Sequence, residues 1–139
     1  MQKSILPVAI AILFVGPANA GDRREQIHKA VQQLVPWLEK GAVGSSQHNK
    51  CFTCHNHGLP IMALEEAKSQ GLKVNDEILT AQVAHTTQFL SSGRKRYEEG
   101  KGQGGRVLTA GCALWALQRG KVSGSETTDA VVQYLLHDQ

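Results

Sequence analysis

Two cysteines and two histidines lie within eight residues, in the stretch KCFTCHNH at positions 50–57. The pattern Cys-x-x-Cys-His is the attachment sequence for c-type haem, in which two thiols bond to the porphyrin vinyl groups and the adjacent histidine binds the iron. Two intervening residues on a tight helical turn would set the thiols at the vinyl separation. The pattern therefore predicts a covalent haem c, tethered through Cys51 and Cys54, with His55 as the proximal iron ligand.

Three other chemistries are open to these side chains. A redox-active disulfide normally opens a helix that follows a strand, and no strand is predicted before Cys51. A zinc ion could take both cysteines and both histidines, but neighbouring ligands strain a tetrahedral site and the second spaced pair of ligands is missing. A structural disulfide between Cys51 and Cys54 closes too small a loop to stabilise much. Haem attachment is the preferred interpretation.

Several residues are candidates for the sixth iron ligand. Met62 lies only seven residues after His55, on the helix that leaves the same side of the ring, so we expect it in the core. His85, 30 residues after His55 and beside an apolar helical stripe, is the preferred distal ligand, and His28 is the next candidate. His57 is too close to the motif to fold over the ring. A five-coordinate iron that admits small ligands stays open.

The first twenty residues have the pattern of a secretory signal peptide. Lys3 precedes an apolar run over residues 5–15, and the small-residue sequence Ala-Asn-Ala at 18–20 predicts cleavage after Ala20. The run is too short for a membrane span, which needs roughly 20 residues. We therefore expect an exported protein, secreted or periplasmic, whose residues 21–139 form one helical haem domain without a membrane span.

Charge does not identify a partner. Removing residues 1–20 takes away one lysine and leaves 14 basic and 12 acidic side chains, too small an excess to indicate nucleic acid or a membrane surface. The basic run at 94–96 could dock an acidic redox partner, although an exposed loop is the preferred interpretation. The third cysteine, Cys112, is expected to be a small buried apolar residue. Trp37 and Trp115 are likewise expected in the core.

Apolar residues recur at three- and four-residue steps along most of the chain, which predicts an all-α fold of about five helices. The first helix carries its stripe over residues 27–38 and is expected to end at Gly41, where a flexible segment leads to the cysteine motif. The second runs from Pro60 to just before Gly71. Its candidate inward positions are Leu59, Met62 and Ala63.

Three further elements are expected towards the C-terminus. Asn75 is a good N-cap for the third helix, and residues 91–105 read as a long exposed loop. The fourth helix, over 106–119, is apolar on nearly all sides and is expected to be the most buried. A capping box of Ser123 and Glu126 should open the last helix.

The segments WLEK at 37–40 and CFTCHNHGLPIMALEEAKSQGLKV at 51–74 resemble the haem-motif segment of certain exported bacterial proteins built from terpenoid-cyclase-like α/α-toroid repeats. In those proteins a CxxCH motif, followed by LP and an alanine-rich helix, is inserted between the helices of one repeat. The segments at 104–120 and 130–139 are similar to the helix pairs of such a repeat. The resemblance implies a c-type haem carried on helical hairpins, with electron transfer as its role.

The chain also departs from that family. It has neither the acidic D-x-D-D motif nor the glutamine-tryptophan repeat of cyclases, and about five helices are too few for a full toroid. Terpene cyclisation, and catalysis in general, are therefore not expected. The sequence predicts a one-electron carrier with an unidentified redox partner. The alternatives are a haem-based sensor or ligand-binding module with an open distal site, and a non-haem helical interaction domain.

Overall fold

A computed structural model describes residues 20–137, so all of the predicted signal peptide, residues 1–20, except Ala20 lies outside the described part of the chain. The described residues contain helices and no strand, which confirms the all-α class. One π-helical turn, η1 (Cys54–Gly58), precedes the second helix. The six α-helices are α1 (Ala20–His48), α2 (Leu59–Ser69), α3 (Asp76–Ser92), α4 (Arg94–Glu98), α5 (Arg106–Arg119) and α6 (Glu126–His137).

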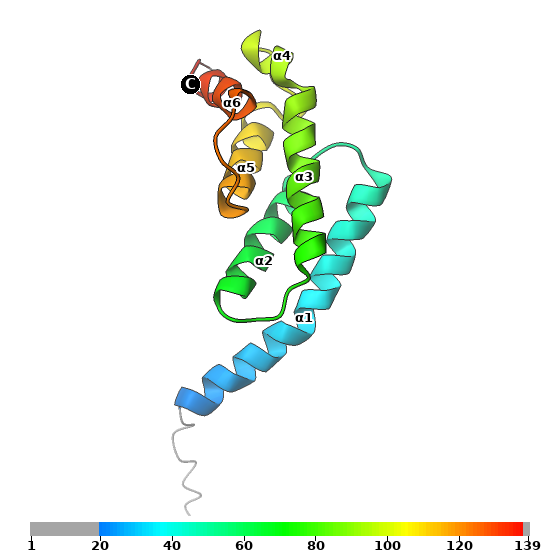
Figure 1. Cartoon of the computed structure of the whole chain (residues 1–139), viewed down its shortest axis with the longest axis vertical. Helices are drawn as coiled ribbons and strands as arrows, with labels where there is room; N and C mark the ends of the chain where they lie inside the picture. The colour runs from blue at the N-terminus through cyan, green and yellow to red at the C-terminus, as the bar shows by residue number, and fades with distance from the viewer. Residues whose placement is uncertain (1–19, 138–139) are drawn as a thin grey trace, which may run out of the picture.

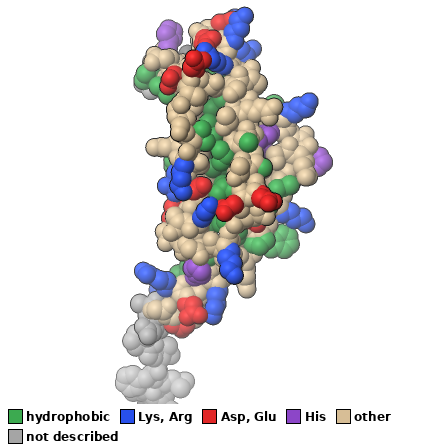
Figure 2. Space-filling model, in the orientation of Figure 1, with side chains coloured by type: hydrophobic (Ala, Val, Ile, Leu, Met, Phe, Trp, Pro, Cys, Tyr) green, Lys and Arg blue, Asp and Glu red, His purple; other side chains and the backbone are tan. Residues whose placement is uncertain are grey.

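The helices form an elongated molecule in which α3 lies along the middle (Figure 1). The lower part of α1 extends beyond α2 and α3 at one end, whereas α4 and α6 lie at the other end (Figure 1). Figure 2 shows basic and acidic side chains spread over the same face. From residue 20 to residue 137, no helix has the length and hydropathy to cross a membrane.

Two apolar clusters form the core, and Val83 of α3 packs against both. Small side chains of α5, among them Ala113 and Ala116, are fully buried and allow its neighbours to approach closely. The first cluster comprises Val35, Ile61, Leu64, Ala67, Leu72, Leu79 and Ala116. The second comprises Phe52, Leu90, Tyr97, Ala110, Ala113, Leu117, Val131 and Tyr134.

The expected end of the first helix at Gly41 is wrong, because α1 continues to His48. Tertiary contacts hold the additional turns: Ala42 is buried, and the Gln82 side chain on α3 donates a hydrogen bond of 3.0 Å to Ser46 Oγ. Glycine weakens a helix interior only modestly. Packing against α3 therefore overrides the local signal and brings the cysteine motif to the far end of α1.

The expected loop over residues 91–105 contains a short helix instead. Tyr97 of α4 is buried against α6, and the centroid of its ring lies 5.4 Å from that of the Tyr134 ring. Its hydroxyl donates to Gln103 Oε1 over 2.8 Å. One aromatic anchor among charged residues gives no helical periodicity, which is why the pattern predicted a loop.

The inward face expected for α2 is partly wrong. On α2 the chain buries Ile61 and Leu64, whereas Leu59 and Ala63 are exposed and Met62 is half-buried. Residues two apart lie on nearly opposite sides of a helix. Helices that are apolar all round give no periodic signal, so only packing selects the buried side.

The same correction applies to the two tryptophans, which were expected in the core. Trp37 is 72% exposed on α1 and Trp115 is 58% exposed on α5. The helix α5 therefore has a buried side and a solvent side, although it was expected to be the most buried. Its most exposed apolar residue is Leu108, at 77%.

One predicted cap is confirmed and one is corrected. The Asn75 side chain accepts hydrogen bonds from the backbone N–H groups of Glu77 and Ile78, at 3.0 and 3.2 Å. Before α6, the reciprocal pair is Ser125 and Thr128 rather than Ser123 and Glu126. Thr128 Oγ1 accepts from the Ser125 N–H at 2.8 Å, and Ser125 Oγ accepts from the Thr128 N–H at 3.3 Å.

Candidate functional site

The cysteine motif connects the end of α1 to α2, and its backbone is not a single helical turn. Thr53 is extended, with φ −130° and ψ 138°, and the π-helical turn η1 begins at Cys54. The expectation of a tight helical turn across residues 51–54 is therefore wrong. The cause is Phe52, which is 4% exposed and packs its ring 5.8 Å from that of Phe89. Burying this ring draws the start of the motif into an extended conformation.

The three residues predicted to hold the haem differ in exposure. Cys51 and His55 are exposed, and Cys54 is half-buried. Both cysteines are free thiols. In an extended segment successive side chains point to opposite sides. The inward Phe52 therefore leaves Cys51 on the outside, where a large group can reach it.

A network centred on His57 fixes the turn. His57 Nδ1 accepts a hydrogen bond of 3.0 Å from the Thr53 N–H and lies 3.1 Å from Thr53 Oγ1. The Thr53 carbonyl in turn accepts from the N–H groups of His57 and Gly58, at 3.0 and 3.3 Å. His57 is fully buried. This histidine therefore holds the conformation of the motif and is not itself at the surface.

The structure brings the predicted distal ligand His85 close to the motif. Its ring stacks on that of His57, with 4.5 Å between the ring centroids and 15° between the planes. Burial, followed by the charge of His85, lowers the pKa of His57. Both rings have a buried Nε2 atom without a hydrogen-bond partner in the described chain.

A cavity of about 490 Å³ adjoins this histidine pair. His85 lines it together with Lys50, the residue before Cys51. The other histidines are elsewhere: His28 and His48 are exposed on α1, and His137 is exposed on α6. His85 is thus the predicted distal candidate that packs directly against a residue of the motif. Iron binding by it stays a prediction.

The described side chains around the cysteine motif do not form a zinc site. Within residues 20–137, no three or more His, Cys, Asp or Glu side chains are grouped so that they could hold one metal ion. A structural zinc ion needs four such ligands. An iron held by a porphyrin needs only one or two protein ligands, so the same observation does not count against haem.

The third cysteine is part of this site, which sequence reasoning missed. Cys112 of α5 approaches η1 so closely that a Cβ atom on Gly58 would lie 2.8 Å from Cys112 Sγ. Cys54 and Cys112 pack against the same core cluster. Burial, followed by a hydrogen bond to the Cys54 thiol, raises the pKa of Cys112 to about 12.

Exposed apolar side chains flank these thiols. Leu59 directly follows η1 and is 54% exposed, while Leu108 and Trp115 lie four residues before and three after Cys112 on α5. Residues three and four apart share a helix face. The spacing of residues 108, 112 and 115 was readable in the sequence, but the apolar residues on the other sides of the helix concealed it.

An ion pair joins α2 and α5. Arg119 of α5 donates to Glu66 of α2 over 2.7 Å. On α5, Trp115 lies one helical turn before Arg119. On α2, Leu59 lies two turns before Glu66. Each apolar residue therefore precedes a member of the ion pair on the same face of its own helix. We call Leu59, Leu108 and Trp115 the apolar rim. Leu59, the first residue of α2, lies five residues after the half-buried Cys54.

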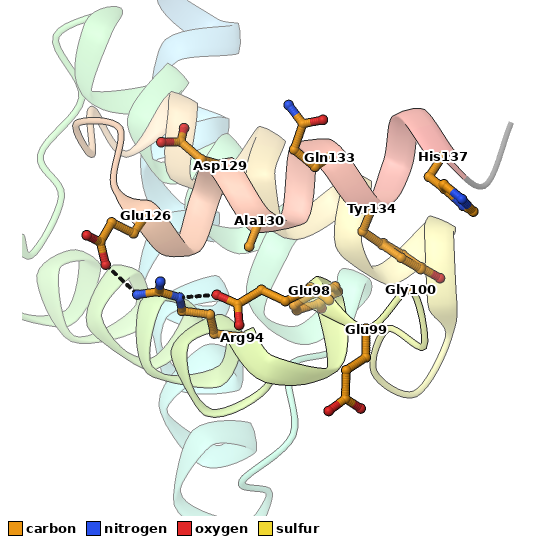
Figure 3. A pocket seen from close by; sticks show the side chains of 11 residues that line it. Arg94, Glu98, Glu99, Gly100, Glu126, Asp129, Ala130, Gln133, Tyr134 and His137 are labelled. Atoms are coloured by element: carbon orange, nitrogen blue, oxygen red, sulfur yellow. Dashed lines mark hydrogen bonds and ion pairs between the residues drawn. The ribbon is translucent and has the colours of Figure 1, made fainter.

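A second hollow lies away from the motif, between α4 and α6 (Figure 3). Its volume is about 790 Å³, and charged side chains such as Arg94, Glu98 and Glu126 line it together with the rings of Tyr97 and Tyr134. Arg94 bonds there to Glu98 at 2.7 Å and to Glu126 at 2.5 Å (Figure 3). Arg96 donates to the Gly102 carbonyl over 2.7 Å. Two of the three basic residues at 94–96 are thus engaged within the chain, which weakens the alternative that this run docks an acidic partner.

Comparisons with models of protein families, with curated proteins and with solved structures find no match. The resemblance to haem-bearing toroid-repeat proteins therefore stays a prediction.

Proposed function

We propose that this protein is an exported c-type haem protein that transfers single electrons. The observation that carries the proposal is the Cys-x-x-Cys-His sequence at 51–55, whose outer thiol and histidine are both exposed. Cys51 and Cys54 form the thioether bonds, and His55 binds the iron. The bound haem supplies a one-electron couple between ferrous and ferric iron.

The surroundings of the motif support this assignment. The exposed apolar rim of Leu59, Leu108 and Trp115 lies on α2 and α5, two of the helices that contact η1, and offers apolar surface of the kind that a porphyrin packs against. The hydrogen bonds between Thr53 and His57 fix the turn that contains His55. Excluding water around a haem is one of the means by which a protein sets its reduction potential.

His85 is the proposed distal ligand. His85 comes from α3, which is remote in sequence from the cysteine motif. Its Nε2 atom is buried without a hydrogen-bond partner, and its ring stacks on that of His57. A buried imidazole nitrogen without a hydrogen bond is costly unless it gains a partner. Iron coordination would supply that partner.

Absorption spectra and intact mass of the exported protein test the proposal. The full chain is produced with and without a haem-attachment system, then measured oxidised and after reduction with dithionite. We expect a covalent haem mass and a sharp reduced α-band only with the attachment system. Cys51→Ala and Cys54→Ala should each lose one thioether bond, whereas Cys112→Ala should keep both. An unmodified mass without visible absorption, in cells able to attach haem, would overturn the proposal.

A sensor or ligand-binding module with an open iron site is the second candidate function. The observation that favours it is the stacking of His85 on His57, because this contact holds the buried Nε2 of His85 within the fold and would leave the sixth iron position open. Carbon monoxide added to the reduced protein separates the two functions. A marked Soret shift supports the open site, and an unchanged spectrum supports two protein ligands.

A further inference from the structure

The position of Cys112 changes the pairing that the cysteine spacing suggests. Cys51 and Cys54 are close in sequence, but Phe52 is buried and Thr53 is extended between them, so Cys51 lies on the exposed side. Cys54 instead begins the turn that ends at Gly58, and the Leu59 N–H bonds back to the Cys54 carbonyl. Cys54 therefore belongs to the same compact turn that Cys112 touches.

Three observations place Cys112 beside Cys54. The Cys112 Sγ atom lies within 2.8 Å of the position of a Cβ on Gly58, so α5 meets η1 at the sulfur itself. Both cysteines contact the core cluster that contains Phe52, Ala110 and Ala113. The Cys54 thiol is also one of the groups that raise the pKa of Cys112, so the two side chains interact. Bringing two free thiols together in this way raises the local concentration of one at the other, as any intramolecular reaction does.

We propose that Cys54 and Cys112 form a reversible disulfide when the haem-free chain meets a disulfide oxidant. The Cys54 thiolate attacks one sulfur of the oxidant, forms a mixed disulfide and releases one oxidant thiol. The Cys112 thiol then loses its proton to solvent as its sulfur attacks the Cys54 sulfur, which closes the disulfide and releases the second oxidant thiol. The two cysteines lose two protons and two electrons in total, and the oxidant disulfide is reduced to two thiols.

The disulfide gives Cys112 a role beyond packing. A sulfur that is bonded to Cys112 cannot form a thioether, so the pair would control whether Cys54 is free for covalent attachment. The bond would also join η1 to α5 across 57 intervening residues, a long loop whose closure constrains the unfolded chain. The inference goes beyond haem binding and does not require it.

The test uses the full chain, produced without a haem-attachment system and incubated with oxidised glutathione. Remaining thiols are then alkylated in acid and the protein is digested with trypsin. Both motif cysteines fall in the peptide 51–68, and Cys112 falls in the peptide 107–119. We expect these two peptides to be joined in the wild type, with an intact mass lower by two hydrogens.

Three variants identify the partner of Cys112. Cys51→Ala should keep the joined peptides, whereas Cys54→Ala should reduce their yield at least tenfold and Cys112→Ala should abolish them. Circular dichroism checks that each variant keeps its helices. The inference is overturned if folded Cys51→Ala gives no joined peptides, or if Cys54→Ala gives as much as the wild type. Because no haem is present in the experiment, its failure would leave the proposed function untouched, and failure of the haem test would leave this result untouched.

Discussion

Thr53 and His57 hold the cysteine motif through one acceptor nitrogen. His57 Nδ1 accepts the Thr53 N–H, and burial of the ring disfavours its charged form. A neutral His57 is therefore part of the folded state. Protonation of Nδ1 would remove this acceptor and place a charge against His85, whose ring is stacked on that of His57.

This state makes the stability of the haem-free chain depend on pH. The pKa of His57 is lowered from its usual value of 6.5, so below that pH the unfolded chain binds a proton that the folded chain resists. The contribution is fully present above pH 6.5 and is lost as the pH falls through the lower, folded pKa. We expect urea unfolding to show this loss between pH 7 and pH 5.

The replacement His57→Asn should flatten that pH dependence, because an amide oxygen can accept the Thr53 N–H and does not titrate. His137→Gln, at an exposed position of α6, is the matched control and should leave the slope as in the wild type. An unchanged slope in His57→Asn would show that another group is responsible.

Cys112 and Cys51 should differ strongly in reactivity. Raising the pKa of Cys112 from 9.0 to about 12 lowers its thiolate fraction at pH 8 by about a thousandfold. Cys51 is exposed. We expect iodoacetamide to alkylate Cys51 far faster than Cys112 in the folded haem-free chain, measured by peptide mass against time. In 6 M guanidinium chloride the two rates should converge. Comparable rates in the folded chain would contradict the raised pKa of the half-buried Cys112.

The glycines of α1 and η1 differ in the space around them. A Cβ on Gly41, within α1, meets nothing within 4 Å, whereas a Cβ on Gly58 would lie 2.8 Å from Cys112 Sγ and 3.1 Å from the Phe52 ring. Gly58 has φ −63°, so the restriction there is space and not backbone conformation. A larger side chain therefore fits at Gly41 but not at Gly58.

Alanine at each position tests this difference. Gly41→Ala should stabilise the chain by about 0.5–1 kcal/mol, because it removes the entropic cost of glycine in a helix. Gly58→Ala should destabilise it, since α5 or the Phe52 ring must move, by about 1–3 kcal/mol. Urea unfolding of the haem-free proteins measures both. A neutral Gly58→Ala would indicate that η1 and α5 are farther apart than described.

At the scale of the whole molecule, α5 and Val83 join two apolar clusters. Ala116 belongs to the cluster around α2, while Ala110 and Ala113 belong to the cluster around α6. Because the two clusters share a helix, loosening one should loosen the other. We expect one cooperative unfolding transition for the described helices.

Leu64→Ala tests the coupling. Leu64 is fully buried in the α2 cluster, so its truncation should cost about 2–5 kcal/mol. Leu136→Ala, at a position 60% exposed on α6, is the control and should change stability little. Circular dichroism and tryptophan fluorescence should give the same shifted midpoint for Leu64→Ala. Separate midpoints would mean that the clusters unfold independently.

The sequence by itself determined the elements that depend on local signals. The all-α class and the Asn75 cap of α3 follow from helical periodicity and capping, which act within a few residues. The Cys-x-x-Cys-His spacing was also readable, because it is fixed by the chain itself, and the haem attachment that it indicates stays a prediction.

Only the tertiary structure decided the features that depend on contacts between distant segments. Packing on α3 extended α1 past Gly41, and burial of Phe52 opened the motif into an extended conformation. The same packing left Trp115 at the surface and placed Cys112 beside Cys54. Helices that are apolar on all sides give no signal of which side will be buried, so that choice is made by the neighbours they meet in the folded chain.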